Sequence, residues 1–286
     1  MEDIYKIDPS DFPPCLLEIP EQPKKLFIRG KLPDPEEFVY LGIVGSRKYT
    51  SYGKDVLEKL VDSLKGYPVV IVSGLALGID SLAHKRALQN NILTLAIPGS
   101  GLDRNVLYPA TNFHLAEEIL EKGGCLLSEF EPSMRATLWS FPRRNRIMAG
   151  LCKAILIIEA EEKSGTLITA RLAVEYNRDV LVVPGSIFSD NSKGTNQFLR
   201  LGATPITSSD DLLEALGFEK DNQQNEQIEL NLSNEEKLVL EIIKEPLSKD
   251  ILISKLGMET SKASILLSLM EIKGLIKEEF GEIRKN

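Results

Sequence analysis

Six short apolar runs alternate with helix-length segments between residues 39 and 218, and this alternation is the strongest constraint on the fold. A nearly continuous apolar run is typical of a strand that is covered on both faces, as in a parallel sheet. Strands that alternate with helices form right-handed βαβ units. The sequence therefore predicts an α/β domain over 39–218, with a doubly wound, mostly parallel, Rossmann-like sheet. The runs are VYLGIVG (39–45), VVIVSG (69–74), ILTLAIPG (92–99), CLLSEF (125–130), AILIIEA (154–160) and VLVVPG (180–185).

Segments of different character lie on either side of this domain. Residues 1–38 are proline-rich and have no sustained period, so we expect a lead-in strap with a short strand at LFIRG (26–30). Residues 219–230, EKDNQQNEQIEL, are polar and typical of a linker. The strap and the linker are therefore expected to lack the regular pattern of the central domain.

The C-terminal segment, 231–286, has the pattern of a small helical domain. Ser233 and Glu236 have the spacing of a capping box at the start of a helix. Two further helix-length segments and a short hairpin pattern follow, which predicts a winged helix-turn-helix. Residues 219–286 hold fourteen acidic and ten basic residues, and this acidic balance disfavours binding to duplex DNA. A protein-contact or regulatory role therefore stays open beside DNA binding.

Composition argues against several classes of protein. No apolar run approaches the roughly 20 residues that cross a bilayer, and the first residues, MEDIYKIDPSDFPP, lack the basic start and apolar core of a signal peptide. Cys15, Cys125 and Cys152 are far apart in sequence, no CxxC motif occurs and there are only two histidines. We therefore expect free thiols in a cytoplasmic protein, with no zinc site and no disulfide framework.

One basic, aromatic stretch departs from the acidic character of the chain, whose formal net charge is -8. From Arg135 to Lys153 there are five basic residues and no acid, and Trp139, the single tryptophan, and Phe141 lie among them. A ligand responds to the field near its site, so an acidic protein can still hold a local anion site. The stretch is therefore a candidate binding surface.

The arginines of this stretch divide between helix faces. Arg143 and Arg146 share one face of a predicted helix, whereas Arg144 points elsewhere. Arginine binds phosphate through a bidentate fork, and an aromatic ring stacks on an unpaired base. Alternatively, the aromatic residues of the stretch are core residues and one arginine pairs with an acid such as Glu129 or Glu159. We favour a single-stranded nucleic acid as the ligand.

The loops that follow the predicted strands carry the other candidate residues. In an open parallel sheet, ligands bind beyond the carboxyl ends of the strands. These loops hold glycines, small hydroxyls and N–H donors, and the helices behind them favour anions at their N-termini. Arg47 and Lys163 add positive charge at the same edge, so we expect a phosphate-binding rim there. The loops are GSR (45–47), SGLALGID (73–80), PGSGLD (98–103), SEFEP (128–132), EEKSGT (161–166) and PGSIFSDNSKGTN (184–196).

Standard catalytic signatures are missing. The first strand ends in GIVGSR in place of GxGxxG, NSKGT does not match GxxxxGK[ST], and there is no GxSxG. Asp80 and His84 lie four residues apart with Ser73 nearby in sequence, an arrangement compatible with a triad. We predict instead an Asp80–His84 contact on a helix surface. The chain is expected not to be an enzyme and to need no cofactor.

Eight motifs occur in an order that resembles the DNA-processing protein A family, also called DprA or Smf. The resemblance covers essentially all of 39–218, and residues 8–30 resemble the family's lead-in. The motifs are GIVGSR, IVSGLALGIDSLAH, PGSGLDRNVLYP, LLSEF, FPRRNRIMAGL, IIEAEEKSGTLITA, RDVLVVPGS and GTNQFLRLGA.

This resemblance implies a cytoplasmic bacterial protein with an extended Rossmann fold that binds single-stranded DNA without sequence preference. It implies a homodimer formed through the Rossmann domain, and a role in protecting incoming DNA and loading the RecA recombinase during natural transformation. The C-terminal segment is similar to the winged-helix domain of many members. The small helical domain with which many members begin is expected to be absent.

The resemblance also implies DNA-binding positions. Those that match the family's motifs are Gly45, Ser46, Arg47, Phe141, Arg143, Asn145, Arg146, Lys163, Ser164 and Gly165. The strand-end loops add Ser73, Gly74 and Thr166 as candidates at the same edge. No residue is expected to act catalytically or to bind a metal.

Two other functions stay open. The sheet is also similar to that of lysine-decarboxylase-like nucleotide-processing enzymes, whose signature is PGGxGTxxE. The corresponding stretch here is EKSGTLIT (162–169), and Thr169 stands where the glutamate belongs, which counts against an enzyme. The other alternative is a regulator that binds duplex DNA through 233–286, and the acidic balance counts against it.

Overall fold

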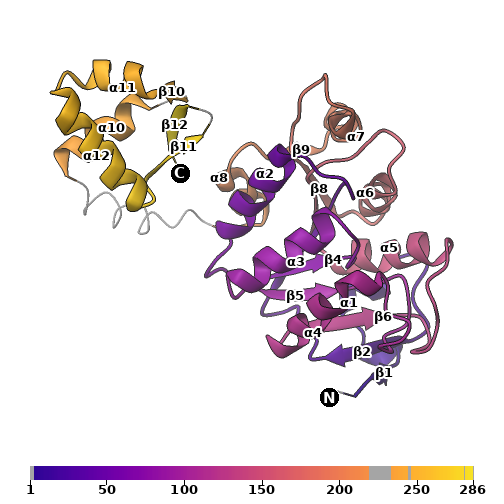
Figure 1. Cartoon of the computed structure of the whole chain (residues 1–286). Helices are drawn as coiled ribbons and strands as arrows, with labels where there is room; N and C mark the ends of the chain where they lie inside the picture. Colours follow the sequence, from indigo (N-terminus) through magenta and orange to yellow (C-terminus); the bar gives the residue numbers. More distant parts are fainter. Residues whose placement is uncertain (1–2, 219–232, 244–245, 280, 286) are drawn as a thin grey trace. The chain divides into compact units, whose positions relative to one another are not determined.

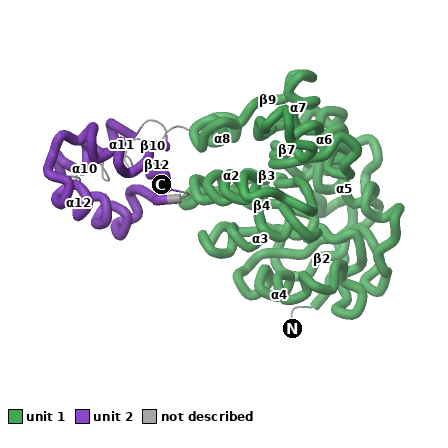
Figure 2. The backbone as a smooth tube through the Cα atoms, turned by 45° about the horizontal axis from the view of Figure 1, so that its top comes forward, with its two compact units in different colours: residues 1–219 green, residues 220–286 purple. Residues whose placement is uncertain are grey.

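The chain forms two compact units, Met1–Glu219 and Lys220–Asn286 (Figure 2). The linker predicted over 219–230 lies outside the residues that the structure describes. In this computed structural model the described residues are 3–218, 233–243, 246–279 and 281–285.

The described part of unit 1 is built on a nine-stranded sheet with the order β1-β2-β6-β5-β4-β3-β7-β8-β9 (Figure 1). Strands β3 to β9 run parallel to one another, whereas β1 and β2 are antiparallel to their neighbours. The predicted α/β fold with a mostly parallel sheet is confirmed. The strands are β1 (Tyr5–Ile7), β2 (Leu26–Gly30), β3 (Val39–Val44), β4 (Val69–Ser73), β5 (Leu93–Ala96), β6 (Cys125–Ser128), β7 (Ala154–Ile157), β8 (Asp179–Val182) and β9 (Thr204–Pro205).

Two strands of the lead-in, β1 and β2, are part of this sheet. The strand predicted at LFIRG is β2, which pairs antiparallel with β6, and β1 pairs in turn with β2. The lead-in therefore belongs to the same compact unit as residues 39–218. Each of the six apolar runs contains one strand, from β3 to β8.

Helices cover both faces of the sheet, as a doubly wound fold requires (Figure 1). Helices α2, α3 and α8 pack on one face around Ile43 and Ile71, and α5, α6 and α7 pack on the other around Val44 and Val72. Successive residues of a strand therefore enter opposite cores. The helices are α1 (Pro14–Leu17), α2 (Ser51–Asp62), α3 (Ile79–Gln89), α4 (Phe113–Glu121), α5 (Ser140–Leu151), α6 (Thr166–Glu175), α7 (Lys193–Arg200) and α8 (Ser209–Ala215). Among the described helices, none combines the length and apolar character of a membrane span.

The strand order reverses between β3 and β7. From β3 the sheet grows outward through β4, β5 and β6, and the chain then returns to place β7 on the other side of β3. The helices that follow these two strands, α2 and α6, lie on opposite faces of the sheet. The loops at the carboxyl ends of β3 and β7 therefore diverge, and such a switch point is where open parallel sheets bind ligands.

The described part of unit 2 combines three helices with a small sheet of order β10-β12-β11. The predicted capping box is confirmed, because the Glu236 N–H donates to the Ser233 hydroxyl and the Ser233 N–H donates to the Glu236 carboxylate. The predicted hairpin is formed by β11 and β12, and Val239 and Leu252 pack with Ile283 in one core. The elements are α10 (Asn234–Ile242), β10 (Leu247–Ser248), α11 (Lys249–Leu256), α12 (Thr260–Ile272), β11 (Ile276–Glu279) and β12 (Glu282–Lys285).

The contact predicted between Asp80 and His84 on a helix surface is wrong, because both side chains of α3 are buried. The Asp80 carboxylate accepts a hydrogen bond from the Gly74 N–H (3.1 Å). His84 Nδ1 lies 2.6 Å from Thr94 Oγ1, and its Nε2 finds no hydrogen-bond partner among the described residues. Burial, with a smaller contribution from the positive charge of Arg144, lowers the pKa of His84 to about 3.

Acid is therefore expected to destabilise the fold through His84. The unfolded chain titrates this histidine near its ordinary pKa of about 6.5, whereas the folded chain keeps it neutral down to a pH of about 3. The stabilisation is complete above a pH of about 6.5 and is lost as the pH falls toward 3, by up to about 1.4 kcal/mol per pH unit. Urea unfolding between about pH 7.5 and pH 5 measures this loss, and His84→Gln should reduce the slope. His114→Gln changes the exposed histidine and should keep the wild-type slope. Equal slopes for wild type and His84→Gln would contradict the assignment.

Candidate functional site

A cleft of about 550 Å³ lies at the switch point, between the loop after β3, the loop after β7 and the start of α5. Its volume is typical of pockets that hold a ligand. Most of the predicted binding residues meet here, although they come from three separate segments. Those that line the cleft are Gly45, Ser46, Arg47, Phe141, Asn145, Ser164, Gly165 and Thr166.

The loop after β3 is held in place by the residues that precede α3. The Ile79 N–H donates to the Ser46 carbonyl oxygen (3.1 Å), and the Lys48 N–H donates to the Ser46 hydroxyl (3.0 Å). Gly78 has a φ of +87°, and a Cβ there would clash with the backbone of Ser46 and Arg47, so this position requires glycine. These contacts fix the backbone around Ser46 and leave Arg47 exposed at the cleft.

The loop after β7 is bonded to the loop after β3. The Thr166 hydroxyl donates to the Gly45 carbonyl oxygen (3.1 Å), and the Ser164 hydroxyl donates to Thr166 Oγ1 (2.9 Å). Helix α6 begins at Thr166, so the positive end of its dipole lies beside the cleft and favours an anion there. Lys163 does not line the cleft but is exposed next to Ser164, where it adds positive charge.

The N-terminus of α2, the other helix at the switch point, already holds a carboxylate of the protein. Glu159 is buried and accepts hydrogen bonds from the Thr50 N–H (2.9 Å) and the Thr50 hydroxyl (2.6 Å). A Cβ at Gly53 would clash with the Glu159 carboxyl group, so the helix leaves space for it. Because the Glu159 carboxyl group occupies this helix end, the start of α6 and the exposed Arg47 are the parts of the switch point that stay open to an anion.

Arg144 forms part of the floor of the cleft, although it is absent from the predicted binding residues. Its buried Nη1 donates to the carbonyl oxygens of Gly74 (2.7 Å) and Ile97. Its Nε donates to Asn145 Oδ1 (2.9 Å). Asp80 lines the same floor; burial raises the pKa of Asp80 and lowers that of Arg144, and each charge opposes the shift of the other. The floor therefore holds a buried cation and a buried acid that influence each other electrostatically.

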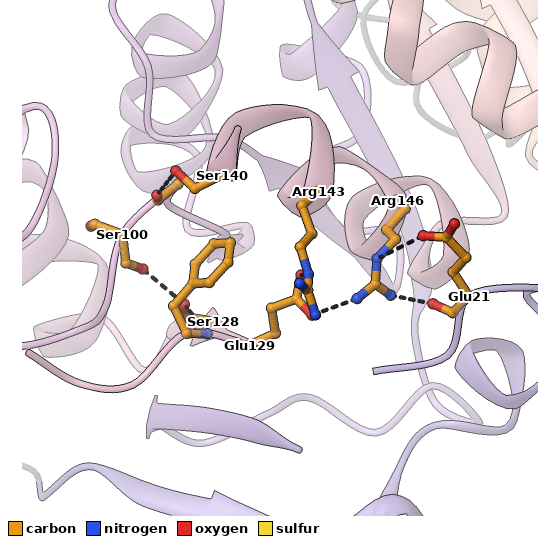
Figure 3. Close-up of polar contacts among 9 residues, drawn as sticks. Glu21, Ser100, Ser128, Glu129, Ser140, Arg143 and Arg146 are labelled. Carbon is orange, nitrogen blue, oxygen red and sulfur yellow. Dashed lines mark hydrogen bonds and ion pairs between the residues drawn. The ribbon is translucent and has the colours of Figure 1, made fainter. Parts of the chain in front are cut away.

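Arg143 and Arg146 hold Glu129 between them and do not line the cleft (Figure 3). Arg143 Nε donates to Glu129 Oε1 (3.0 Å), and Arg146 Nη2 donates to Glu129 Oε2. Arg146 also donates to the carbonyl oxygen of Glu21 in the lead-in. The shared helix face of the two arginines is confirmed, and so is the alternative that an arginine pairs with Glu129. Burial lowers the pKa of Arg146, and the Glu129 carboxylate opposes this shift.

The two aromatic candidates differ in their position. Phe141 lines the cleft and an adjoining pocket of about 30 Å³. Its ring packs against Gly99, where a Cβ would clash with it, and lies 5.6 Å from the ring of Tyr108. Trp139 does not line the cleft, and its ring meets Phe130 edge-on at 5.7 Å. Phe141 is therefore the aromatic residue that a ligand in the cleft would meet.

Ser73 and Gly74 lie under or beside the cleft and stabilise it through hydrogen bonds. Ser73 is fully buried, and its hydroxyl donates to the Ile43 carbonyl oxygen (2.6 Å). Gly74 borders the adjoining pocket, and its peptide groups bond to Asp80 and Arg144. The structure thus places the Ser73 side chain beneath the site, without bringing it to the cleft.

The position that bears a glutamate in the alternative enzyme holds a buried threonine. Thr169 lines the cleft, where the acids are Asp80 and the exposed Glu161. In the described part of the chain, no group of three or more His, Cys, Asp or Glu side chains is placed to hold a metal ion. The arrangement is suited to binding and orienting an anion.

The sequence matches the model of one known protein family. Residues 3–217 match the model of DNA recombination-mediator protein A. The chain belongs to this family. The resemblance to the DprA/Smf family that the motifs carry is thereby confirmed.

Curated members of the family have high sequence identity to this chain. Protein Smf of Escherichia coli is 41% identical over 211 residues, which cover 74% of this chain and 56% of that protein. DNA processing protein DprA of Streptococcus pneumoniae is 41% identical over 207 residues, or 72% of each chain. The chain therefore spans little more than half the length of the Escherichia coli protein.

Two solved structures share the fold of unit 1. The X-ray structure of DprA from Streptococcus pneumoniae has a TM-score of 0.70 at 39% identity, and the match covers 76% of this chain and 75% of that one. A structure of DprA from Helicobacter pylori, titled for its single-stranded DNA binding mode, has a TM-score of 0.67 at 30% identity. That match covers 76% of this chain and 98% of the other.

Removal of Glu129 is expected to destabilise unit 1 strongly. Its side chain and that of Arg146 are 4% and 6% exposed, so Glu129→Ala leaves a buried guanidinium without its carboxylate. Breaking such a pair lowers the free energy of unfolding by about 3–5 kcal/mol. Urea unfolding followed by circular dichroism measures the change. The matched control is Glu131→Ala, whose side chain is 59% exposed and pairs with Lys25, and it should change the value by less than about 1 kcal/mol. If both variants lost a similar amount of unfolding free energy, the Glu129–Arg146 pair would not be a special source of stability.

Proposed function

We propose that this protein binds single-stranded DNA, without sequence preference, in the cleft at the switch point between β3 and β7. The observation that carries the proposal is the meeting of positive charge and an aromatic ring at one sheet edge. Arg47 is exposed at the cleft, Lys163 lies beside it, and Phe141 lines the same cleft. Phosphate contacts carry no sequence information, and an aromatic ring stacks on any base. The Helicobacter pylori relative, titled for single-stranded DNA binding, supports this ligand.

An unpaired strand suits this cleft better than a duplex. In a duplex the bases are stacked on one another, so Phe141 and Tyr108 would meet only sugars and phosphates. A single strand can place a phosphate near Arg47 and turn a base toward the rings. Glu159 also disfavours a nucleotide-processing mode, because it occupies the helix end at α2 where a bound phosphate would otherwise sit.

The candidate residues take different roles in this proposal. Arg143, whose side chain is 54% exposed, contacts a phosphate outside the cleft, and the buried Arg146 positions Glu129 and hence Arg143. Ser73 and Gly74 shape the floor. The residues proposed to contact DNA within the cleft are Gly45, Ser46, Arg47, Phe141, Asn145, Ser164, Gly165 and Thr166, with Lys163 at its edge.

The wider role that we propose is the one expected of the family. We infer that the protein is a non-enzymatic, cytoplasmic mediator of recombination that protects incoming DNA and loads RecA during natural transformation. The match to the DNA recombination-mediator protein A model supports the mediator role. We also infer that unit 2 is a winged helix, since its order is helix, strand, two helices and hairpin.

Loss of the exposed cations is expected to weaken DNA binding and its salt dependence together. On single strands each neutralised phosphate contributes about 0.7 to the log–log salt slope, so Arg47→Ala/Lys163→Ala should lose about 1.4 of it. Fluorescence anisotropy of labelled oligo-dT across a salt series, with a duplex competitor, measures both quantities. Lys59→Ala removes an exposed cation from the last turn of α2 and should leave both unchanged. An unchanged slope in the double variant, or a preference for the duplex, would place the DNA elsewhere.

A homodimer through unit 1 is the remaining expectation from the family. Val174 and Leu201, at the ends of α6 and α7, are 61% and 73% exposed and offer an apolar contact. Light scattering of the full chain should give twice the monomer mass, and Leu201→Asp should give the monomer. Leu17→Asp, which changes an exposed leucine of the lead-in, should leave the dimer intact. A monomeric wild type at micromolar concentration would refute the dimer.

A further inference from the structure

The loop after β8, residues 184–192, carries two strongly exposed apolar side chains. Ile187 and Phe188 are 78% and 92% exposed. The ring of Tyr52, in the first turn of α2, is held at the same loop, because its hydroxyl donates to the Pro184 carbonyl oxygen (2.7 Å). The loop lines no part of the cleft, although its sequence predicts that it belongs to the binding rim. Exposed apolar side chains that gather at one place mark binding sites.

Hydrogen bonds on both sides of Phe188 fix the conformation of this loop. The Phe188 N–H donates to the Ser186 hydroxyl (3.2 Å), and the Ser189 N–H donates to the Ser186 carbonyl oxygen (3.1 Å). Further along, the Ala160 N–H donates to the Asn191 carbonyl oxygen (2.8 Å). The ring of Phe188 is therefore presented from a defined turn, and such preorganisation lowers the entropic cost of binding.

The loop is continuous with the cleft through Lys48. This exposed lysine lines the cleft, and its carbonyl oxygen accepts a hydrogen bond from Asn191 Nδ2 (3.0 Å). Strands β3, β7 and β8 are parallel neighbours, so the loops after them follow one another along one edge of the sheet. At about 4.8 Å per strand, the end of β8 is about 10 Å from the end of β3, which about three stacked nucleotides span. A strand that leaves the cleft past Lys48 therefore reaches Phe188.

The charges around the loop are of both signs. Asp190 pairs with Lys193 (2.7 Å), and Glu161 and Glu162 are exposed on the neighbouring loop after β7. Phosphate contacts at this loop therefore add little to binding. What the loop offers is the face of an aromatic ring, and every base has a π-face that stacks on such a ring.

We propose that the loop after β8 is a second base-binding subsite for the single strand, in which Phe188 stacks on a base about three nucleotides beyond the cleft. The inference rests on the proposed binding of single-stranded DNA and extends its site along the edge of the sheet. Stacking of this kind tolerates any base, in keeping with binding without sequence preference. Phe188 precedes α7 and Leu201 follows it, so the subsite is separate from the apolar contact proposed for the dimer.

The test compares labelled oligo-dT strands of about 4 and about 10 nucleotides in fluorescence anisotropy with the full chain. Phe188→Ala should bind the longer strand about fivefold or more weakly, because stacking on one base is lost, and should bind the shorter strand like wild type. The salt slope should stay unchanged, because no phosphate contact is removed. Circular dichroism checks that the variant keeps its fold.

Two matched variants separate stacking from apolar contact. Phe188→Tyr keeps an aromatic ring and should bind both strands like wild type. Phe188→Leu keeps an apolar side chain without the ring and should lose as much affinity for the longer strand as Phe188→Ala does.

Each other outcome overturns the proposal in a recognisable way. Equal binding of the longer strand by wild type and Phe188→Ala would remove the subsite, and full affinity of Phe188→Leu would remove the stacking. A lower mass of Phe188→Ala in light scattering would make a second copy of the chain the occupant. Failure of the proposed function is distinct, because Arg47→Ala/Lys163→Ala would then bind the shorter strand like wild type, and both proposals would be overturned.

Discussion

The buried guanidinium of Arg144 is the contact on which the cleft depends. It extends from α5 and donates to the main-chain carbonyls of Gly74, after β4, and Ile97, after β5. Three segments that are distant in the sequence are thereby joined at one edge of the sheet. A buried charge is tolerated only where hydrogen bonds satisfy it, and a Cβ on Gly74 would clash with this side chain. The same bonds that stabilise the edge of the fold therefore also hold the Arg144 guanidinium in the floor of the cleft, together with Asp80.

Glu159 determines which of the two helix ends at the switch point is free for a ligand. In an open α/β sheet the first helix after the switch often holds a phosphate at its N-terminus. Here that end of α2 is neutralised by a carboxylate from the end of β7, bonded to Thr50. The start of α6 and the exposed Arg47 are left for an anion, one strand further along the sheet. The anion site of this cleft is therefore at a different helix end from the phosphate site of a dinucleotide-binding protein, although the two proteins share a fold.

Local sequence patterns are sufficient to predict the strands, but they do not predict which residues the buried polar side chains contact. Strands β3 to β8 are predicted by their apolar runs, because a strand that is buried on both faces is composed almost entirely of apolar residues. Helical phase placed Arg143 and Arg146 on one face correctly. The position of a residue on a helix does not show which residues its side chain contacts. Only the fold shows that Arg143 and Arg146 share Glu129 as a partner and that Arg144 donates to main-chain carbonyls. Strands β1 and β9, with three and two residues, are too short to leave a pattern and form by pairing with a neighbour.

The distribution of charge reconciles an acidic chain with the proposed anionic ligand. The net charge is -8, yet Arg47, Lys48 and Lys163 are exposed at or beside one cleft. At physiological salt, charges more than about 8 Å apart are largely screened, so a strand in the cleft responds mainly to the charges around it, which are these three cations and the exposed Glu161. A nucleic acid lying across the remaining surface would meet an excess of carboxylates. The proposed binding of DNA in unit 1 therefore follows from the place at which its exposed cations gather.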